Sequence, residues 1–154
     1  MTKIPGWKAL EIKHIVFDYN GTLAHNGKVK SGILDHLSAL TSKYKVYVIT
    51  ADTYGTVSEA FKDVDVNLLI LKNETGTIEK ANWVKELGPE YTIAIGNGRN
   101  DRDMLAIASV GIAVCGNEGL AVETLMSADV MVHDIIDAIN MIQNPKALIA
   151  TLRE

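Results

Sequence analysis

Six short apolar runs alternate along the chain with stretches in which apolar residues recur at helical spacing. The runs are rich in β-branched residues, and the first four end at polar residues or at a glycine. They cover residues 15–17, 46–49, 68–71, 91–95, 111–114 and 130–132. Continuous apolar runs are typical of strands that are buried on both faces of a parallel sheet. The pattern therefore predicts six strands.

The stretches between these runs predict six helices, marked by apolar residues three or four positions apart. The first residues of their apolar faces are Ile33, Val57, Ile78, Met104, Leu120 and Ile135. Ser31 is expected to cap the first helix, Asp134 to cap the sixth, and Gly88 with Pro89 to end the third. Pro145 suits the first position of a further helical segment. Alternating strands and helices predict a doubly wound, three-layer α/β/α fold of Rossmann-like type with a mainly parallel sheet.

The composition indicates one globular domain that spans residues 1–154. Of these residues, 47% are hydrophobic and 22% are charged, which excludes a disordered or fibrous chain. The net charge of −4 argues against a nucleic-acid partner, which would require clustered lysine and arginine. The single cysteine, Cys115, favours a reducing compartment, and no apolar segment is long enough to cross a membrane. We therefore expect a cytoplasmic protein without a membrane partner.

Polar side chains that could carry chemistry follow four of the predicted strands. Asp18, Thr50 and Lys72 follow the first three strands, and Asn97 with Asp101 follows the fourth. In a doubly wound sheet, ligands bind beyond the carboxyl ends of the strands. These side chains are therefore expected to gather at one edge of the sheet.

Each of these segments also has an ordinary structural interpretation. Asp18 could be a nucleophile or a ligand for a hard cation, or it could only begin a turn. Thr50 could donate to a phosphoryl oxygen, or only end a strand. Lys80, near the start of the third helix, could reach the site or face solvent, and Lys72 competes with it. The glycine-framed loop at 96–103 could bind an anion or a metal, or only precede a helix with an acidic start.

Together, the four segments resemble the motifs of the haloacid-dehalogenase-like (HAD) superfamily of phosphatases and phosphotransferases. That family combines a strand ending in Asp-x-Asp-Gly-Thr, a strand-end Thr or Ser, a Lys near a helix start and an acidic pair in a Gly-Asp-x-x-x-Asp type loop. The order and spacing match across residues 12–133, with Asp-Tyr-Asn-Gly-Thr at 18–22 and Gly-Asn-Gly-Arg-Asn-Asp at 96–101. The stretches 80–84 and 95–101 look most like the phosphorylation domain of P-type ATPases, and the segments 18–24 and 95–101 also resemble its small, soluble relatives without a cap domain.

The resemblance implies an Mg²⁺-dependent phosphohydrolase that works through an aspartyl-phosphate on Asp18. Thr50 and Lys80 would hold the transferred phosphoryl oxygens, and Asn20 occupies the position of a catalytic acid. The implied metal ligands are Asp18, the backbone carbonyl of Asn20, Asn97 and Asp101. The residues implied to border the bound cofactor are Gly21, Thr22, Ala51 and Asn100. These residue types suit phosphoryl transfer, which depends mainly on positioning and on neutralising charge.

Two asparagines depart from the family pattern. Asn20 stands where the family's phosphatases have an aspartate that protonates the leaving oxygen and then activates water, and an amide does neither at neutral pH. Asn97 replaces a metal-binding aspartate and offers only an uncharged oxygen. Asp52 and Asp103 could compensate, or they could be capping or surface residues. We therefore expect weak Mg²⁺ binding and a preference for good leaving groups, as in acyl phosphates or ATP, over sugar phosphates.

The spacing of the motifs leaves no room for a cap domain. The chain between Asp18 and Thr50 can hold a turn and one helix, and the chain between Thr50 and Lys80 a helix and a strand. Residues 24–30, with Asn26-Gly27 at their centre, predict a small hairpin flap. Because capless members of the family often use a neighbouring subunit as a lid, a homo-oligomer is expected. The substrate would be a phosphorylated small molecule, a nucleotide or a macromolecule.

Two alternatives to an active enzyme stay open. The chain could be a catalytically weak or inactive module that binds phosphate or phosphoproteins, because two expected carboxylates are amides. It could also be a purely structural α/β domain. The presence of Asp18, Thr50, Lys80 and Asp101 together favours the enzyme.

Overall fold

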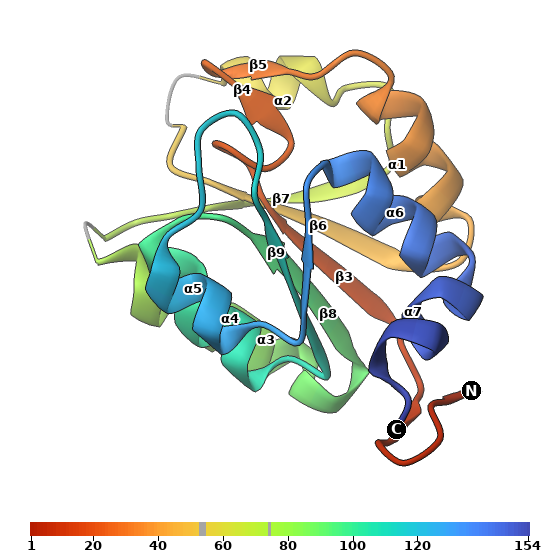
Figure 1. The fold of residues 1–154 in the computed structure, drawn as a ribbon. Helices are drawn as coiled ribbons and strands as arrows, with labels where there is room; N and C mark the ends of the chain where they lie inside the picture. The colour runs from red at the N-terminus through yellow and green to blue at the C-terminus, as the bar shows by residue number, and fades with distance from the viewer. Residues whose placement is uncertain (53–54, 74) are drawn as a thin grey trace.

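The computed structural model of the chain describes residues 1–52, 55–73 and 75–154. Its main strands are β3 (His14–Asp18), β6 (Lys45–Thr50), β7 (Val66–Ile70), β8 (Thr92–Gly96), β9 (Val110–Val114) and β10 (Val130–Val132). They form one sheet in the order β10-β9-β8-β3-β6-β7, and every neighbouring pair is parallel. Helices cover both faces of this sheet (Figure 1). The predicted doubly wound fold and its six strands are therefore confirmed.

The helices match the apolar repeats of the sequence. They are α1 (Ile33–Thr41), α2 (Thr56–Ala60), α3 (Gly76–Leu87), α4 (Arg102–Ile107), α5 (Val122–Ser127), α6 (Ile135–Gln143) and α7 (Pro145–Leu152). Two short 3₁₀ helices, η1 (Pro89–Tyr91) and η2 (Arg99–Asp101), precede β8 and α4. None of the helices in the described part of the chain combines the length and the apolar character needed to span a bilayer.

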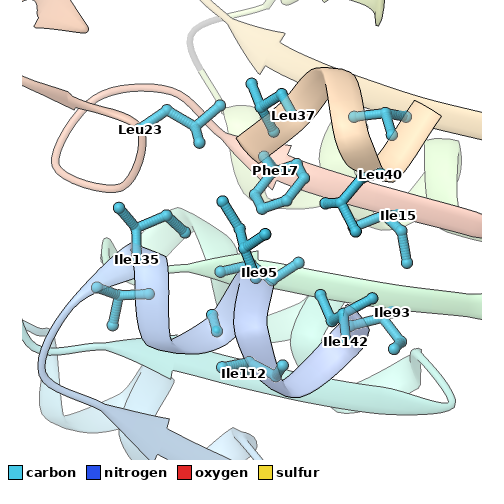
Figure 2. Packing of buried hydrophobic residues seen from close by; sticks show 14 of the residues in the cluster. Ile15, Phe17, Leu23, Leu37, Leu40, Ile93, Ile95, Ile112, Ile135 and Ile142 are labelled. Carbon is cyan, nitrogen blue, oxygen red and sulfur yellow. The ribbon is translucent and has the colours of Figure 1, made fainter. Parts of the chain in front are cut away.

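The sheet separates two apolar cores. On one face, Phe17 of β3 and Ile95 of β8 pack with Leu37 of α1 and Ile135 of α6 in the larger core (Figure 2). On the other face, the alternate side chains of the same strands pack against α3 and α4. This second cluster includes Val16 and Ala94 from the strands and Val84 and Met104 from the helices. Successive residues of a strand point to opposite faces. Continuous apolar strands are therefore needed to fill both cores.

The helix ends agree with the sequence at three positions and differ at a fourth. Helix α3 ends at Leu87, with Gly88 as its C-cap and Pro89 after it, as predicted. The side chain of Asp134 accepts a hydrogen bond from the backbone N–H of Ile136 and caps α6, and Pro145 is the first residue of α7. The prediction that Ser31 caps α1 is wrong. Gly32 occupies the capping position with a φ of 81°, and no side chain caps the helix there. The left-handed turn at Gly32 starts the helix one residue later than a cap at Ser31 requires.

Helix α3 presents a different face to the sheet from the one that its apolar residues predict. Ala81 and Val84 are buried as expected, but the side chain of Ile78 is 63% exposed. Lys80 is only 2% exposed. The apolar pattern predicts that this position faces solvent, but the charged side chain is buried. This rotation of the helix directs Lys80 towards the carboxyl ends of the central strands.

A small flap follows β3, as the sequence predicts. Strands β4 (Ala24–His25) and β5 (Lys28–Val29) pair antiparallel, and Asn26 and Gly27 between them have φ values of 51° and 76°. Two positive φ values in a two-residue loop are the signature of a type I′ hairpin turn. A second small pair, β1 (Thr2–Lys3) with β2 (Ala9–Leu10), was not expected from the sequence. In the described residues, only this flap with α1 separates β3 from β6, and only α2 with β7 separates β6 from α3.

Candidate active site

The predicted site residues meet where the strand order of the sheet reverses. The chain runs outwards from β3 to β6 and β7, then returns to β8 on the other side of β3. Asp18 is the last residue of β3, and Asn97 directly follows β8. Ligand sites of doubly wound sheets lie at such a reversal, beyond the carboxyl ends of the strands. The fold therefore places Asp18 and the 96–103 loop beside each other.

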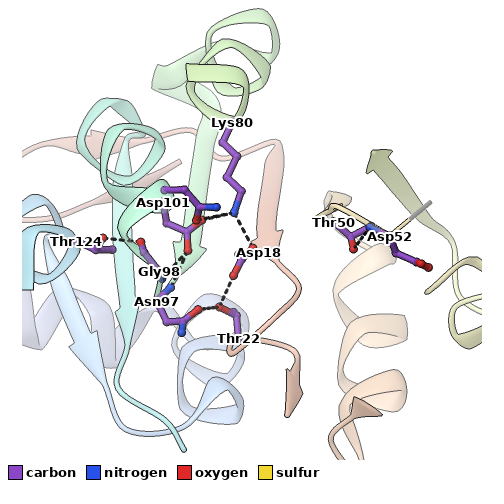
Figure 3. Close-up of polar contacts among 10 residues, drawn as sticks. Asp18, Thr22, Thr50, Asp52, Lys80, Asn97, Gly98, Asp101 and Thr124 are labelled. Carbon is purple, nitrogen blue, oxygen red and sulfur yellow. Dashed lines mark hydrogen bonds and ion pairs between the residues drawn. The ribbon is translucent and has the colours of Figure 1, made fainter. Parts of the chain in front are cut away.

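Lys80 joins two carboxylates at this point. Its Nζ atom lies 2.7 Å from Asp18 Oδ1 and 2.7 Å from Asp101 Oδ1, and it also donates to Asn100 Oδ1 at 3.2 Å (Figure 3). The competing Lys72 is exposed, and its backbone N–H donates to Glu79 on the outside of α3. Of the two candidate lysines, the structure brings Lys80 to the site.

Asp101 organises the loop after β8. Its Oδ2 atom accepts hydrogen bonds from the backbone N–H groups of Asn97 at 3.0 Å and Gly98 at 2.9 Å, while Oδ1 accepts from Lys80. The side chain has no exposed surface. With both oxygens engaged in this way, Asp101 shapes the loop and orients Lys80. The metal-binding role that the family resemblance gives to Asp101 stays a prediction.

A different pair of oxygens suits a small hard cation. The hydroxyl of Thr22 lies 3.4 Å from Asp18 Oδ2 and 3.2 Å from Asn97 Oδ1, so these two oxygens lie on either side of this hydroxyl, and Asp18 presents to it the oxygen that does not contact Lys80. The Asn97 amide is held in this orientation because its Nδ2 donates to the carbonyl of Gly119 at 3.2 Å. Carboxylate, amide and carbonyl oxygens are the ligands that Mg²⁺ prefers, usually with several waters. The donor set therefore fits a divalent cation.

The same donor set is poor in charge. Among the residues that the structure describes, no three His, Cys, Asp or Glu side chains are grouped so that they could hold a metal ion. Asp18 supplies the carboxylate, Asn97 is uncharged, and the side chain of Asn20 is exposed. A cation held at this point would meet one carboxylate, and the weak Mg²⁺ affinity expected from the sequence stays a prediction.

The buried cluster changes the protonation of its members. Burial, together with the nearby Asp101 carboxylate, raises the pKa of Asp18 from an ordinary value of 3.8 to about 7, although Lys80 opposes the shift. Burial lowers the pKa of Lys80, but Asp18 and Asp101 outweigh this effect and raise it overall. Lys80 is therefore charged at any physiological pH. With both carboxylates ionised the cluster carries one net negative charge.

Thr50 lies on the neighbouring strand, beside Asp18. Residue 49 of β6 pairs with Asp18, and the buried Thr50 hydroxyl follows at the strand end, where it accepts from the backbone N–H of Asp52 at 3.1 Å. The next residue, Ala51, is exposed. A hollow of about 330 Å³ opens here between the flap and α2, and it is lined by Tyr19, Asn20, Gly27, Thr50, Ala51, Asp52, Thr56 and Val57.

Two further carboxylates have structural contacts. Asp52 Oδ2 accepts from the hydroxyl of Thr56 and the backbone N–H of Val57, both at 2.8 Å, and so caps α2. Asp103 pairs with Arg102 on the surface. The capping and surface interpretations of these two residues are confirmed.

Several groups that hold the site in place are not marked by any pattern in the sequence. The buried Thr124 of α5 donates to the carbonyl of Gly98 at 2.6 Å and braces the 96–103 loop. Glu79 fixes the turn before α3 through the backbone N–H groups of Lys72 and Asn73. These contacts join residues from different elements, and no local pattern marks them.

Two kinds of curated relative match the chain: a small uncharacterised protein and a much longer ATPase. No protein-family model matches the chain. An uncharacterised protein of Methanocaldococcus jannaschii is 44% identical over 70 residues, which are 46% of this chain and 75% of that protein. A probable copper-transporting ATPase of Arabidopsis thaliana is 30% identical over 129 residues, which are 79% of this chain but only 12% of the ATPase. The chain thus corresponds to a small part of the transporter.

Solved structures share the fold. The cobalt-bound deoxy-D-mannose-octulosonate 8-phosphate phosphatase of Haemophilus influenzae superposes with a TM-score of 0.73, with 16% identity and coverage of 89% of this chain and 90% of that one. The corresponding phosphatase of Moraxella catarrhalis, in complex with magnesium, phosphate and a sugar, gives a TM-score of 0.67 at 19% identity, with coverage of 93% and 94%. These phosphatases share the fold of this chain, and a P-type ATPase matches most of its length, in agreement with the resemblance to the haloacid-dehalogenase-like superfamily that the four motifs indicate.

Proposed function

We propose that the protein is a phosphohydrolase that transfers a phosphoryl group from its substrate to Asp18 and then to water. The observation that carries this proposal is the position of Lys80, whose Nζ atom lies 2.7 Å from both Asp18 and Asp101 in a buried cluster. A lysine held in this way fixes Asp18 and supplies positive charge where an anionic phosphate would approach an anionic nucleophile.

The proposed phosphoryl transfer has two steps. In the first, a carboxylate oxygen of Asp18 forms a bond to phosphorus, the bond to the leaving oxygen breaks, and the leaving group departs with the bonding electrons. In the second, water attacks phosphorus, the bond to Asp18 breaks with its electrons returning to the Asp18 carboxylate, and inorganic phosphate leaves with the protons of the water. The hydroxyl of Thr50 and the ammonium of Lys80 are suited to hold the phosphoryl oxygens throughout. Asp18 must be ionised to attack phosphorus. Because its pKa is raised to about 7 in the site without a metal, the reactive carboxylate form predominates there only above about pH 7.

The cation that we propose for this site is Mg²⁺, held by Asp18, Asn97 and the backbone carbonyl of Asn20. It would supply positive charge to the phosphoryl group. Asn97 contributes no charge, and Lys80 already neutralises part of the carboxylate charge. We therefore expect millimolar rather than micromolar Mg²⁺ to be required.

The absence of an acid at residue 20 selects among substrates. An alkoxide leaving group needs a proton, whereas a carboxylate or a phosphate leaves as a stable anion. General acid catalysis is worth about 10²–10⁴ in rate. The enzyme is therefore expected to prefer acyl phosphates or phosphoanhydrides over sugar phosphates.

The decisive experiment measures phosphate release with Mg²⁺ from acetyl phosphate, p-nitrophenyl phosphate and glucose 6-phosphate. Asp18→Asn should abolish turnover, and Asn20→Asp should raise the rate with glucose 6-phosphate. Turnover that survives in Asp18→Asn, or equal rates with all three substrates, would contradict the mechanism.

One observation favours a second candidate function, a module that binds phosphate without turning it over. Asn20 and Asn97 both replace carboxylates, while Lys80 and Thr50 keep the groups that would hold phosphate. Binding of inorganic phosphate by the native chain, without release of phosphate from any substrate, would support this alternative. The homo-oligomer expected from the missing cap is also a proposal, to be measured by light scattering in solution.

A further inference from the structure

The hollow beside Asp18 has a defined shape. Its volume is about 330 Å³, near the lower end of the range for small-molecule sites. The phenol of Tyr19 forms one wall, donates to the flap carbonyl of Gly27 at 2.8 Å and packs edge-on against Phe61 with ring centroids 6.1 Å apart. The flap, through Gly27, and the end of α2, through Phe61, thus hold the Tyr19 wall of the hollow in a fixed position.

This hollow is the space that remains for a leaving group. On the β8 side of Asp18, the buried side chains of Lys80, Asn97 and Asp101 fill the site. On the β6 side, Asn20 and Thr50 line the hollow, and each lies one or two positions beyond Asp18 or its paired residue on β6. A phosphoryl group bound at Asp18 would therefore direct the rest of its substrate over the end of β6.

The described lining of the hollow carries one kind of charge. Asp52 contributes a carboxylate, and no Lys, Arg or His is among the lining residues that the structure describes. Asp52 is fixed in place, because Thr56 and Val57 both donate to its Oδ2 atom at 2.8 Å. Its charge also acts on its neighbours, since burial and the Asp52 carboxylate together raise the pKa of Tyr19.

From this arrangement we infer that Asp52 sets substrate specificity by charge: the hollow accepts leaving portions that are neutral or cationic and disfavours those that already carry negative charge. The inference rests on the proposed function and narrows it. Of the two kinds of good leaving group, it favours small acyl or aryl phosphates over nucleoside di- and triphosphates. Two like charges a few ångströms apart in a half-open site correspond to about a tenfold difference in affinity.

The test uses three phosphonates of similar size that cannot be hydrolysed: 2-aminoethylphosphonate, propylphosphonate and phosphonoacetate. Their affinities for the full chain are measured by calorimetry with Mg²⁺ present. The native protein should bind the cationic and neutral compounds about tenfold more tightly than the anionic one. Asp52→Asn should reduce this ratio to about twofold or less. Asparagine keeps an oxygen that can cap α2, so the fold is expected to persist.

Asp103→Asn is the matched control, because it also removes one carboxylate but lies outside the hollow. It should keep the native order of affinities. Binding of propylphosphonate by Asp52→Asn reports that the variant is folded. Equal binding of the anionic and neutral compounds by the native protein, an unchanged ratio in Asp52→Asn, or no binding of any of the three would overturn the inference.

The same protein preparations, without phosphonate, are assayed for phosphate release from acetyl phosphate. This assay separates the charge-selectivity inference from the proposed hydrolase activity. Charge selectivity without turnover would remove the proposed hydrolase activity and leave the inference standing. Turnover without charge selectivity would do the reverse.

Discussion

The buried cluster of Asp18, Lys80 and Asp101 places two negative charges around one positive charge. Such a cluster is costly to bury unless every member has partners. Here Asp101 accepts from Lys80 and from two backbone N–H groups, whereas Asp18 has Lys80, a long contact of 3.4 Å from Thr22 and a share of the Tyr19 backbone N–H, which also donates to Ile49. Asp18 is thus the less satisfied carboxylate. This leaves it available to react, at a cost to the stability of the fold.

Replacing Asp18 by asparagine should therefore stabilise the protein at alkaline pH. The pKa of Asp18 is raised to about 7 in the folded state, so its contribution to stability is present below about pH 4 and is lost as the pH rises to about 7. The gain in the free energy of unfolding from Asp18→Asn should be roughly 1–3 kcal/mol larger at pH 8 than at pH 5. The raised pKa of Lys80 adds no slope in this range.

Urea unfolding at the two pH values measures this difference. Asp65→Asn is the control, because it removes an exposed carboxylate. It should change the free energy of unfolding by similar small amounts at pH 5 and at pH 8. A stabilisation by Asp18→Asn that is the same at pH 5 and pH 8 would show that Asp18 is ionised throughout.

Removing the cation from the cluster should have the opposite effect. Lys80→Met leaves Asp18 and Asp101 facing each other without a positive charge between them. Breaking a buried ion pair in this way typically costs about 3–5 kcal/mol. Lys85→Met, on the exposed side of the same helix, should change the free energy of unfolding by less than about 0.5 kcal/mol. Equal losses in the two variants would mean that Lys80 is no more than a surface residue.

At the scale of single residues, the sequence predicted the main members of the site but not their contacts. Asp18 and Thr50 were recognisable because each directly follows an apolar run, and Asn97 because it follows the fourth run after a single glycine. The choice between Lys72 and Lys80 depends on the rotation of α3, and the occupied oxygens of Asp101 depend on the path of the backbone after β8. Neither the rotation of α3 nor the backbone path after β8 can be predicted from the local spacing of residues.

At the scale of elements, the loop after β3 depends on one glycine. Gly21 has a φ of 77°, and a Cβ atom there would collide with the side-chain amide of Asn97. The loop can pass this close to the β8 loop only without a side chain. The approach brings Asp18 and Asn97 to the same point, so the glycine serves the site and not only the turn.

Gly21→Ala should therefore lose about 2–4 kcal/mol of stability, from the left-handed conformation and from displacement of Asn97. The matched control is Gly27→Ala in the flap turn, where φ is 76° but no atom lies within 4 Å of the added Cβ. That variant should lose only about 1–2 kcal/mol. Urea denaturation distinguishes the two, and equal losses would show that backbone conformation alone accounts for both.

The elements themselves were largely predictable. Apolar runs identified the six strands because a parallel sheet is buried on both faces, and Asn26-Gly27 identified the flap because few residues tolerate positive φ. The face of α3 was not predictable, because Ile78 points to solvent and Lys80 points inwards. There the requirement of the site overrides the apolar pattern, as is common at functional positions.

At the scale of the whole molecule, the fold joins loops that are far apart in sequence. Asp18, Lys80 and Asp101 are separated by 62 and 21 positions, and one parallel sheet brings them within hydrogen-bonding distance. Anything that binds this point stabilises three segments of the chain together. Global unfolding therefore reports on occupancy of the site, independently of catalysis.

Mg²⁺ should raise the melting temperature, because it would offset the net negative charge of the cluster. At a concentration ten times its Kd, a ligand adds about 1.4 kcal/mol to the free energy of unfolding, which corresponds to roughly 3–5 °C for a domain of this size. Asp18→Asn should remove the response. Asn97→Asp should melt at a lower temperature than the native protein in EDTA, because it adds a carboxylate to a cluster already in negative excess, and should respond to lower Mg²⁺ concentrations. Asp103→Asn should behave like the native protein. If Asn97→Asp leaves the Mg²⁺ concentration dependence unchanged, residue 97 does not contact the metal and the proposed ligand set is wrong.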